Sequence, residues 1–97
     1  MKSSKSMEKI LKEHRHELVK KYRVSEIGIF GSYATGEQHK KSDVDILIGF
    51  EELPDLYTLC ELERYLEKLL KRKVDLVEKS GLRPRLRERI LNQVVYV

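Results

Sequence analysis

The sequence is poor in cysteine and has no long apolar run. Cys60 is its one cysteine, which excludes an intrachain disulfide and favours a reducing, cytoplasmic location. No stretch approaches the roughly 20 apolar residues that a membrane-crossing helix needs, so we expect no membrane role. The first six residues are largely polar, so no signal peptide is indicated. The sequence contains neither a repeat nor a low-complexity tract.

Charge of neither sign dominates the chain. Its 97 residues include 20 Lys and Arg against 16 Asp and Glu, a formal net charge of +4. This balance suits nucleotides, nucleic acid, an acidic partner or a plain basic surface, and it selects none of them. The hydrophobic fraction of 40% is enough for one small core, so residues 1–97 are expected to form a single domain.

Apolar spacing predicts helices that alternate with strands. Residues 7–22 and 55–71 carry apolar positions at a helical period, and Asp55 suits the N-cap of the second helix. Short apolar runs that include β-branched residues predict buried strands. The expected strands are 27–30, 43–50, 73–78 and 94–97, with a further helix at 83–92. This order favours an α/β (α+β) fold with helices packed against one sheet.

Three aspartates interrupt the apolar strands. Asp43 and Asp45 are two positions apart at the start of one predicted strand, so their side chains point to the same face, and Asp75 lies in another strand. Carboxylates this close repel each other when ionised unless a cation lies between them, and oxygen-only ligands favour Mg²⁺ or Mn²⁺. Taken alone, an Asp-x-Asp pair more often marks a loop end or a helix cap.

A Gly-Ser turn precedes the aspartate pair by ten residues. Gly31 follows the predicted strand 27–30, where a residue without Cβ lets the backbone approach a ligand closely. Ser32 offers a hydroxyl and an N–H to a phosphate, and Ser42 is a further candidate for nucleotide binding. The alternative is an ordinary strand-to-helix turn that needs a glycine. With the three aspartates, the turn predicts a site for a metal-bound triphosphate and nucleotidyl transfer by in-line displacement.

The pattern Gly-Ser-Tyr-Ala-Thr-Gly, followed by Ser-Asp-Val-Asp-Ile-Leu-Ile, resembles the minimal nucleotidyltransferase (MNT) family of the DNA polymerase β superfamily. The resemblance covers the chain from the first predicted strand onward, and it implies a small mixed β-sheet of the polymerase β-like nucleotidyltransferase fold. It maps Gly31 and Ser32 to the nucleotide-phosphate motif. It maps Asp43, Asp45 and Asp75 to catalytic carboxylates that bind Mg²⁺, two ions being expected, or Mn²⁺.

The resemblance also implies a substrate and a partner. The substrate is ATP. The partner is a HEPN-domain protein, an RNase toxin that some antitoxins of the family silence by transferring AMP to one of its tyrosines. Since the chain lacks the accessory domains of larger superfamily members, direct nucleic-acid binding is not expected and a partner protein is expected to complete the site.

Two other functions stay open at this point. The chain could neutralise a HEPN partner by binding alone, with the aspartates structural. It could also transfer a nucleotide to RNA or to a small molecule.

Several side chains keep two interpretations. Tyr33 either stacks on a nucleotide base or packs in the core, while Cys60 is expected to be a small core residue of the second helix. Lys40 and Lys41 either reach phosphates or lie in a solvated loop. The arginines of the last predicted helix either face solvent or contact a partner or phosphates. They are Arg83, Arg85, Arg87 and Arg89.

Overall fold

Helices and strands alternate along the chain in the predicted order. The computed structural model describes residues 4–37 and 43–97. Its elements are α1 (Ser4–Tyr22), β1 (Val24–Phe30), α2 (Ser32–Thr35), β2 (Val44–Phe50), α3 (Leu56–Leu70), β3 (Val74–Glu78), the 3₁₀ turn η1 (Lys79–Gly81), α4 (Pro84–Gln93) and β4 (Val95–Tyr96). The first helix and the first strand both begin three residues earlier than predicted.

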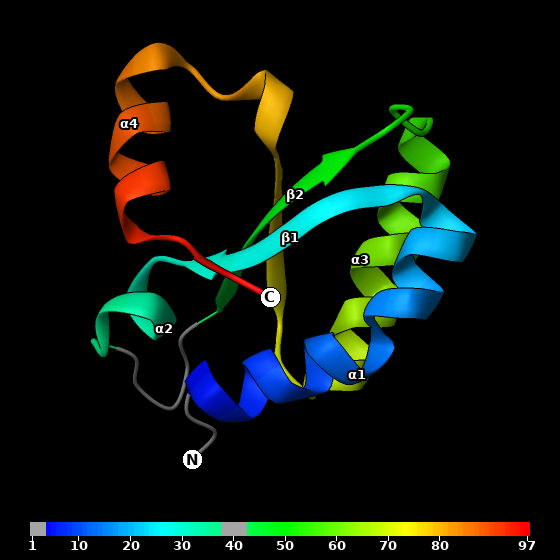
Figure 1. Cartoon of the computed structure of the whole chain (residues 1–97), viewed down its shortest axis with the longest axis horizontal. Helices are drawn as coiled ribbons and strands as arrows, with labels where there is room; N and C mark the ends of the chain where they lie inside the picture. The colour runs from blue at the N-terminus through cyan, green and yellow to red at the C-terminus, as the bar shows by residue number, and fades with distance from the viewer. Residues whose placement is uncertain (1–3, 38–42) are drawn as a thin grey trace.

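The strands form one mixed sheet in the order β3-β2-β1-β4. β1 pairs antiparallel with both β2 and β4, whereas β2 and β3 run parallel. A parallel pair needs a crossover, and α3 provides it. Figure 1 shows α1 and α3 side by side on one side of the sheet and α4 on the other. The predicted fold class, helices packed on a small mixed sheet, is confirmed.

The crossover helix α3 begins and ends at residues suited to those positions. Asp55 is its N-cap, and the carboxylate accepts a hydrogen bond of 2.8 Å from the backbone N–H of Thr58. This bond satisfies one of the free donors of the first turn, as predicted. Lys71, in the left-handed conformation, ends the helix. Among residues 4–37 and 43–97, neither this helix nor any other is long and apolar enough to cross a membrane.

Two apolar cores lie on opposite faces of the sheet. Along β2, Val44, Ile46 and Ile48 belong to the larger core, and Leu47 belongs to the smaller one, because successive side chains of a strand point to opposite faces. The smaller core has Phe30 and Ile90 as its other buried members. The larger core contains Met7, Leu11, Leu18, Tyr22, Val24, Ile27, Ile29, Tyr33, Val44, Ile46, Ile48, Leu62, Leu66, Leu70 and Val74.

The prediction for Cys60 is wrong, because its side chain is exposed. The apolar positions of α3 cover a wider arc than the core can take up. Its buried residues are Leu62, Leu66 and Leu70, which follow one another at the four-residue spacing of a single helix face. Leu56, at the start of the helix, is 77% exposed. An apolar residue at a helical period therefore identifies the helix without showing that the residue is buried.

Tyr33 packs in the larger core and is 1% exposed, so its core interpretation is confirmed and stacking on a base is excluded. Within the described residues, its hydroxyl has no hydrogen-bond partner. Tyr33 therefore anchors the short helix α2 to the core instead of facing a ligand.

Candidate active site

The predicted site residues meet where β1 ends and where β2 and β3 begin. In the sheet register, Asp45 pairs with Phe30 on one side and with Asp75 on the other. Neighbouring strands lie about 4.8 Å apart, so the two aspartates are adjacent across the parallel pair. Asp43 lies just before β2, which begins at Val44 and not, as predicted, at Asp43 itself.

Asp45 and Asp75 lie on the face of the sheet that α4 covers. Asp45 is two residues before Leu47, and Asp75 is two residues before Val77. Leu47 is in the smaller core and Val77 packs against it. Because alternate residues of a strand share a face, the carboxylates extend this face beyond the apolar contacts of α4.

The charges of the three aspartates are coupled. Partial burial, the negative charges of Asp75 and Asp43 and a hydrogen bond with Asp75 together raise the pKa of the Asp45 carboxyl to about 6, and burial is the largest of these causes. Asp45 therefore senses both of the other carboxylates. The structure brings together the three side chains that the sequence singled out, although from two strands and a loop end.

This arrangement fits a divalent cation in its donor chemistry. The donors are all carboxylate oxygens, and a cation between them would relieve the repulsion that raises the pKa of Asp45. In the part of the chain that the structure describes, no three His, Cys, Asp or Glu side chains are already grouped as a metal site. Asp43 and Asp75 are exposed, so a bound ion could reach their carboxylates from solvent.

The backbone at Gly31 requires a glycine for two reasons. Its φ of 72° lies in the left-handed region, where a Cβ is unfavourable. A Cβ built on Gly31 would also lie 2.1 Å from Oδ2 of Asp45. The carboxylate thus occupies the space that the missing side chain leaves. The predicted phosphate turn and the predicted metal ligand are in direct contact.

Hydrogen bonds hold the turn in place. The backbone N–H groups of Ala34 and Thr35 each donate to the carbonyl oxygen of Gly31 at 3.1 Å. The Thr35 hydroxyl donates to the same oxygen at 3.2 Å. Gly36, with a φ of 82°, then ends α2 in the left-handed conformation. The turn is thereby built largely from backbone groups of its own residues.

A surface pocket of about 330 Å³ adjoins this turn. It is lined by Gly31, Ser32, Thr35, Glu37, Arg89 and Gln93. Ser32 thus lies in the pocket wall, as a phosphate-binding residue should. The role of Arg89 could not be decided from the sequence, in which Gln93 did not stand out at all. Arg89 and Gln93 are four residues apart, so they share one face of the helix, and Ile90 lies on the side that faces the sheet. This spacing is the signal that could have identified them.

Two other features lie apart from this pocket. A larger pocket of about 420 Å³ lies on α3, around Leu56, Tyr57, Cys60, Glu61 and Arg64. A single helix forms its wall, and neither the glycine turn nor the aspartates contribute, so we do not assign the reaction to it. Ser42, Lys40 and Lys41, for which the sequence suggested nucleotide or phosphate contacts, lie outside the described residues.

Comparison with known proteins agrees with this geometry. The family model described as "Nucleotidyltransferase domain" matches residues 11–97. The chain belongs to this nucleotidyltransferase family. The resemblance drawn from the Gly-Ser turn and the aspartates is therefore confirmed at the level of the family, and the protein is a nucleotidyltransferase.

Three similar proteins give this family a context. The protein adenylyltransferase MntA of Thermococcus cleftensis is 52% identical over 91 residues, which are 94% of this chain and 92% of that protein. A crystal structure of a toxin-antitoxin with AMP-PNP matches with a TM-score of 0.73 and 28% identity, over 87% of this chain and 69% of that one. A tri-AMPylated Shewanella oneidensis HEPN toxin in complex with an MNT antitoxin matches with a TM-score of 0.68 and 26% identity, over 96% and 70%.

Proposed function

We propose that this chain is the antitoxin of a toxin-antitoxin pair and that it transfers AMP from ATP to a tyrosine of a HEPN RNase toxin. One observation carries the proposal: the Gly31 turn touches Asp45, and Asp45 is paired with Asp75 in the sheet. The adenylyltransferase activity of the Thermococcus relative and the AMPylated toxin in the Shewanella complex support the same reaction. The AMP-PNP complex supports ATP as the donor.

In this reaction, the phenolic oxygen of the acceptor forms a bond to the α-phosphorus of ATP. The bond between that phosphorus and the oxygen that bridges to the β-phosphorus breaks, and pyrophosphate leaves. The phenolic proton passes to a base. Atoms and charge balance without any further reactant.

The chain's own residues divide this work. The backbone of Gly31 and the hydroxyl of Ser32 bind phosphate oxygens from the pocket wall, and we propose that Ser42 adds a nucleotide contact. Asp43 and Asp45 hold Mg²⁺ or Mn²⁺, and Asp75 either completes a second ion's ligand set or accepts the phenolic proton. When bound, the ions supply neutralisation of charge on the phosphate oxygens. Most of the rate enhancement then comes from positioning.

We further propose that residues 1–97 act as one domain and depend on the toxin for the acceptor side of the site. The pocket beside Gly31 has a volume of only about 330 Å³, and its lining comes from the segment 31–37 and from α4. This volume suits part of a nucleotide, which leaves the acceptor tyrosine to be held by the toxin. The cytoplasm, where ATP and RNA targets of a toxin occur together, is the proposed location.

The direct test is incubation of the purified chain with its HEPN partner, Mg²⁺ and ATP labelled on the α-phosphate. Label should appear on the HEPN protein, and mass spectrometry should place an AMP group on a tyrosine. ATP labelled on the γ-phosphate should leave no label, and chelation of the metal should stop the transfer. Label on RNA, or on no macromolecule at all, would contradict the proposal.

The matched variant is Asp43→Asn combined with Asp45→Asn, which keeps the side-chain shapes and removes the charge. Transfer should fall by at least about 100-fold, as when a group that stabilises the transition-state charge is lost. The thermal unfolding midpoint should not decrease, because Asp43 is exposed, Asp45 is only half-buried, and the repulsion between their charges is removed. A double variant that still silences the toxin in cells would instead favour neutralisation by binding alone.

A further inference from the structure

The last helix lies over the face of the sheet that carries the aspartates. Ile90 anchors α4 there by packing with Phe30 and Leu47 in the smaller core. Asp45 pairs with Phe30 in the register, so it lies at the border of the same contact. Figure 1 shows the C-terminal half of α4 directed toward α2 and the end of β1. Side chains of this half of the helix are therefore the ones that can reach the Gly31 turn.

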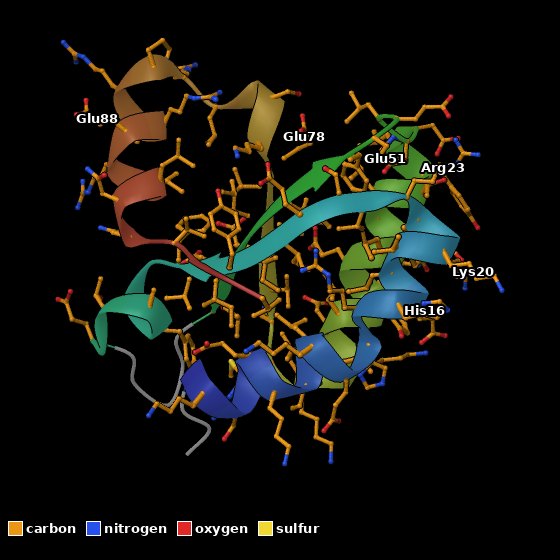
Figure 2. The ribbon with its side chains drawn as sticks, in the orientation of Figure 1. His16, Lys20, Arg23, Glu51, Glu78 and Glu88 are labelled. Carbon is orange, nitrogen blue, oxygen red and sulfur yellow. The ribbon has the colours of Figure 1, made fainter. Side chains whose placement is uncertain are left out.

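The structure distinguishes Arg89 from the other arginines at this helix. Arg89 lines the 330 Å³ pocket together with Gly31 and Ser32. Arg87 lines a different pocket, of about 230 Å³, that also contains Glu26, Glu78 and Lys79. Figure 2 shows Glu78 at the far end of β3, beside η1, away from the start of that strand. Arg83 and Arg85 are exposed and line neither pocket.

A positively charged side chain beside the Gly31 turn would offset the negative charge of a triphosphate bound there. Asp43, Asp45 and Asp75 are all negative when ionised, and so is a triphosphate. Within the described residues, the guanidinium of Arg89 has no hydrogen-bond or ion-pair partner, and Glu37, in the same pocket wall, accepts the Thr35 hydroxyl at 2.9 Å. A guanidinium presents several donors in a planar fork that matches phosphate oxygens.

We propose that Arg89 binds the β- and γ-phosphates of the nucleotide, with Gln93 beside it as a neutral donor. This inference rests on the proposed function, because it assigns a residue to the same site. Arg89 is then a binding residue for the group that leaves as pyrophosphate. The size of the pocket suits this role, since about 330 Å³ is at the lower end for small-molecule sites and fits a phosphate tail better than a whole nucleotide.

The test compares Arg89→Ala with Arg85→Ala, a matched loss of one arginine from the exposed part of the same helix. Binding of AMP-PNP and of AMP is measured by calorimetry with Mg²⁺ and without any acceptor. Arg89→Ala should weaken AMP-PNP binding by about 10- to 100-fold, the usual effect of losing a hydrogen bond between charged groups, and should change AMP binding less than about twofold. Arg89→Lys should restore part of the loss, and Arg85→Ala should bind both like the wild type.

The outcomes separate this inference from the proposed function. Equal AMP-PNP affinity for Arg89→Ala and the wild type, or an equal loss of AMP and AMP-PNP affinity, overturns the assignment of Arg89. Failure of the wild type to bind AMP-PNP overturns it as well. A selective loss of AMP-PNP binding, together with no transfer of label to a HEPN protein, supports Arg89 as a triphosphate ligand and overturns only the proposed acceptor.

Discussion

The two faces of the sheet differ in what covers them and in what they expose. The face under α1 and α3 has a large core, and no charged side chain is buried anywhere in the described part of the chain. The face under α4 has three buried apolar residues, Phe30, Leu47 and Ile90. On the same face, next to these three residues, lie the carboxylates of Asp45 and Asp75.

The difference follows from the cost of burying charge. Carboxylates placed under α1 and α3 would lose hydration without gaining a partner, a cost of several kcal/mol. On the face under α4, which few residues cover, Asp45 is half-buried and the other two aspartates, Asp43 and Asp75, are exposed. One face therefore stabilises the fold, and the other is free to hold charged groups close together. The predictions below test this division, from the largest expected effect to the smallest.

Gly31→Ala should reduce AMP transfer most, by ~100- to 1,000-fold, because the added Cβ would displace the Asp45 carboxylate that lies 2.1 Å from its position. Labelled ATP and the HEPN partner provide the measurement. Gly36→Ala is the control: its φ of 82° is equally unsuited to a side chain, but apart from its two chain neighbours no atom of the described residues lies within 4 Å of the added Cβ. It should cost about 1–2 kcal/mol of stability and little transfer. Equal losses of transfer would show that backbone strain alone matters.

Leu66→Ala should have the largest effect on stability. Leu66 is fully buried between α3 and the sheet, so its truncation leaves a cavity and should lower the free energy of unfolding by about 2–5 kcal/mol. Denaturant unfolding gives this value. Transfer measured well below the melting temperature should stay within about twofold of the wild type. A large loss of transfer by the folded variant would contradict the claim that one face of the sheet stabilises the fold and the other carries the site.

Ile90→Ala should lower stability by about 2 kcal/mol, the low end for such a truncation, because Ile90 is already 9% exposed and its core is small. Unlike Leu66→Ala, it should also weaken AMP-PNP binding, since Ile90 holds the helix segment that carries Arg89. Calorimetry on the folded variant measures this. Unchanged AMP-PNP binding would mean that α4 is positioned by other contacts.

Asp55→Ala should have the smallest effect, confined to stability. The hydrogen bond from Thr58 lowers the pKa of the Asp55 carboxyl from its ordinary 3.8, so the ionised form is favoured in the folded state. Its contribution is complete above pH 3.8 and is lost as the pH falls through the folded-state pKa. The melting-temperature gap between wild type and variant should therefore shrink in acid. Asp55→Asn, which keeps a capping oxygen without charge, should show a gap that changes little with pH, and equal pH dependence would contradict the charge argument.

Much of the fold and the centre of the site could be predicted because their signals are local. The alternation of β2, the cap at Asp55 and the contrast of Asp43, Asp45 and Asp75 with apolar neighbours are visible in short stretches of sequence. Cys60 could not be placed in this way. The period of the apolar residues, Cys60 among them, identifies α3 as a helix. How much of the circumference of that helix is covered depends on how α1 and the sheet pack against it.

Arg89 shows the same limit within the site. Four arginines at one short helix have the same local signal, and a sequence has no means of telling which one faces the Gly31 turn. Tyr33, directly after that turn, looked equally able to bind a base or to fill the core. Its neighbours in space, which come from other elements, decided the matter.

The sequence by itself determined the order of the elements, the need for glycine beside a strand end and the identity of the acidic and phosphate-binding candidates. These depend on the period of apolar residues and on the chemistry of single side chains. Only the tertiary structure decided that Asp45 lies against Gly31, that Asp75 pairs with it and that Arg89 shares their face. Strand register and helix packing join residues far apart in the chain, and no local pattern encodes those distances.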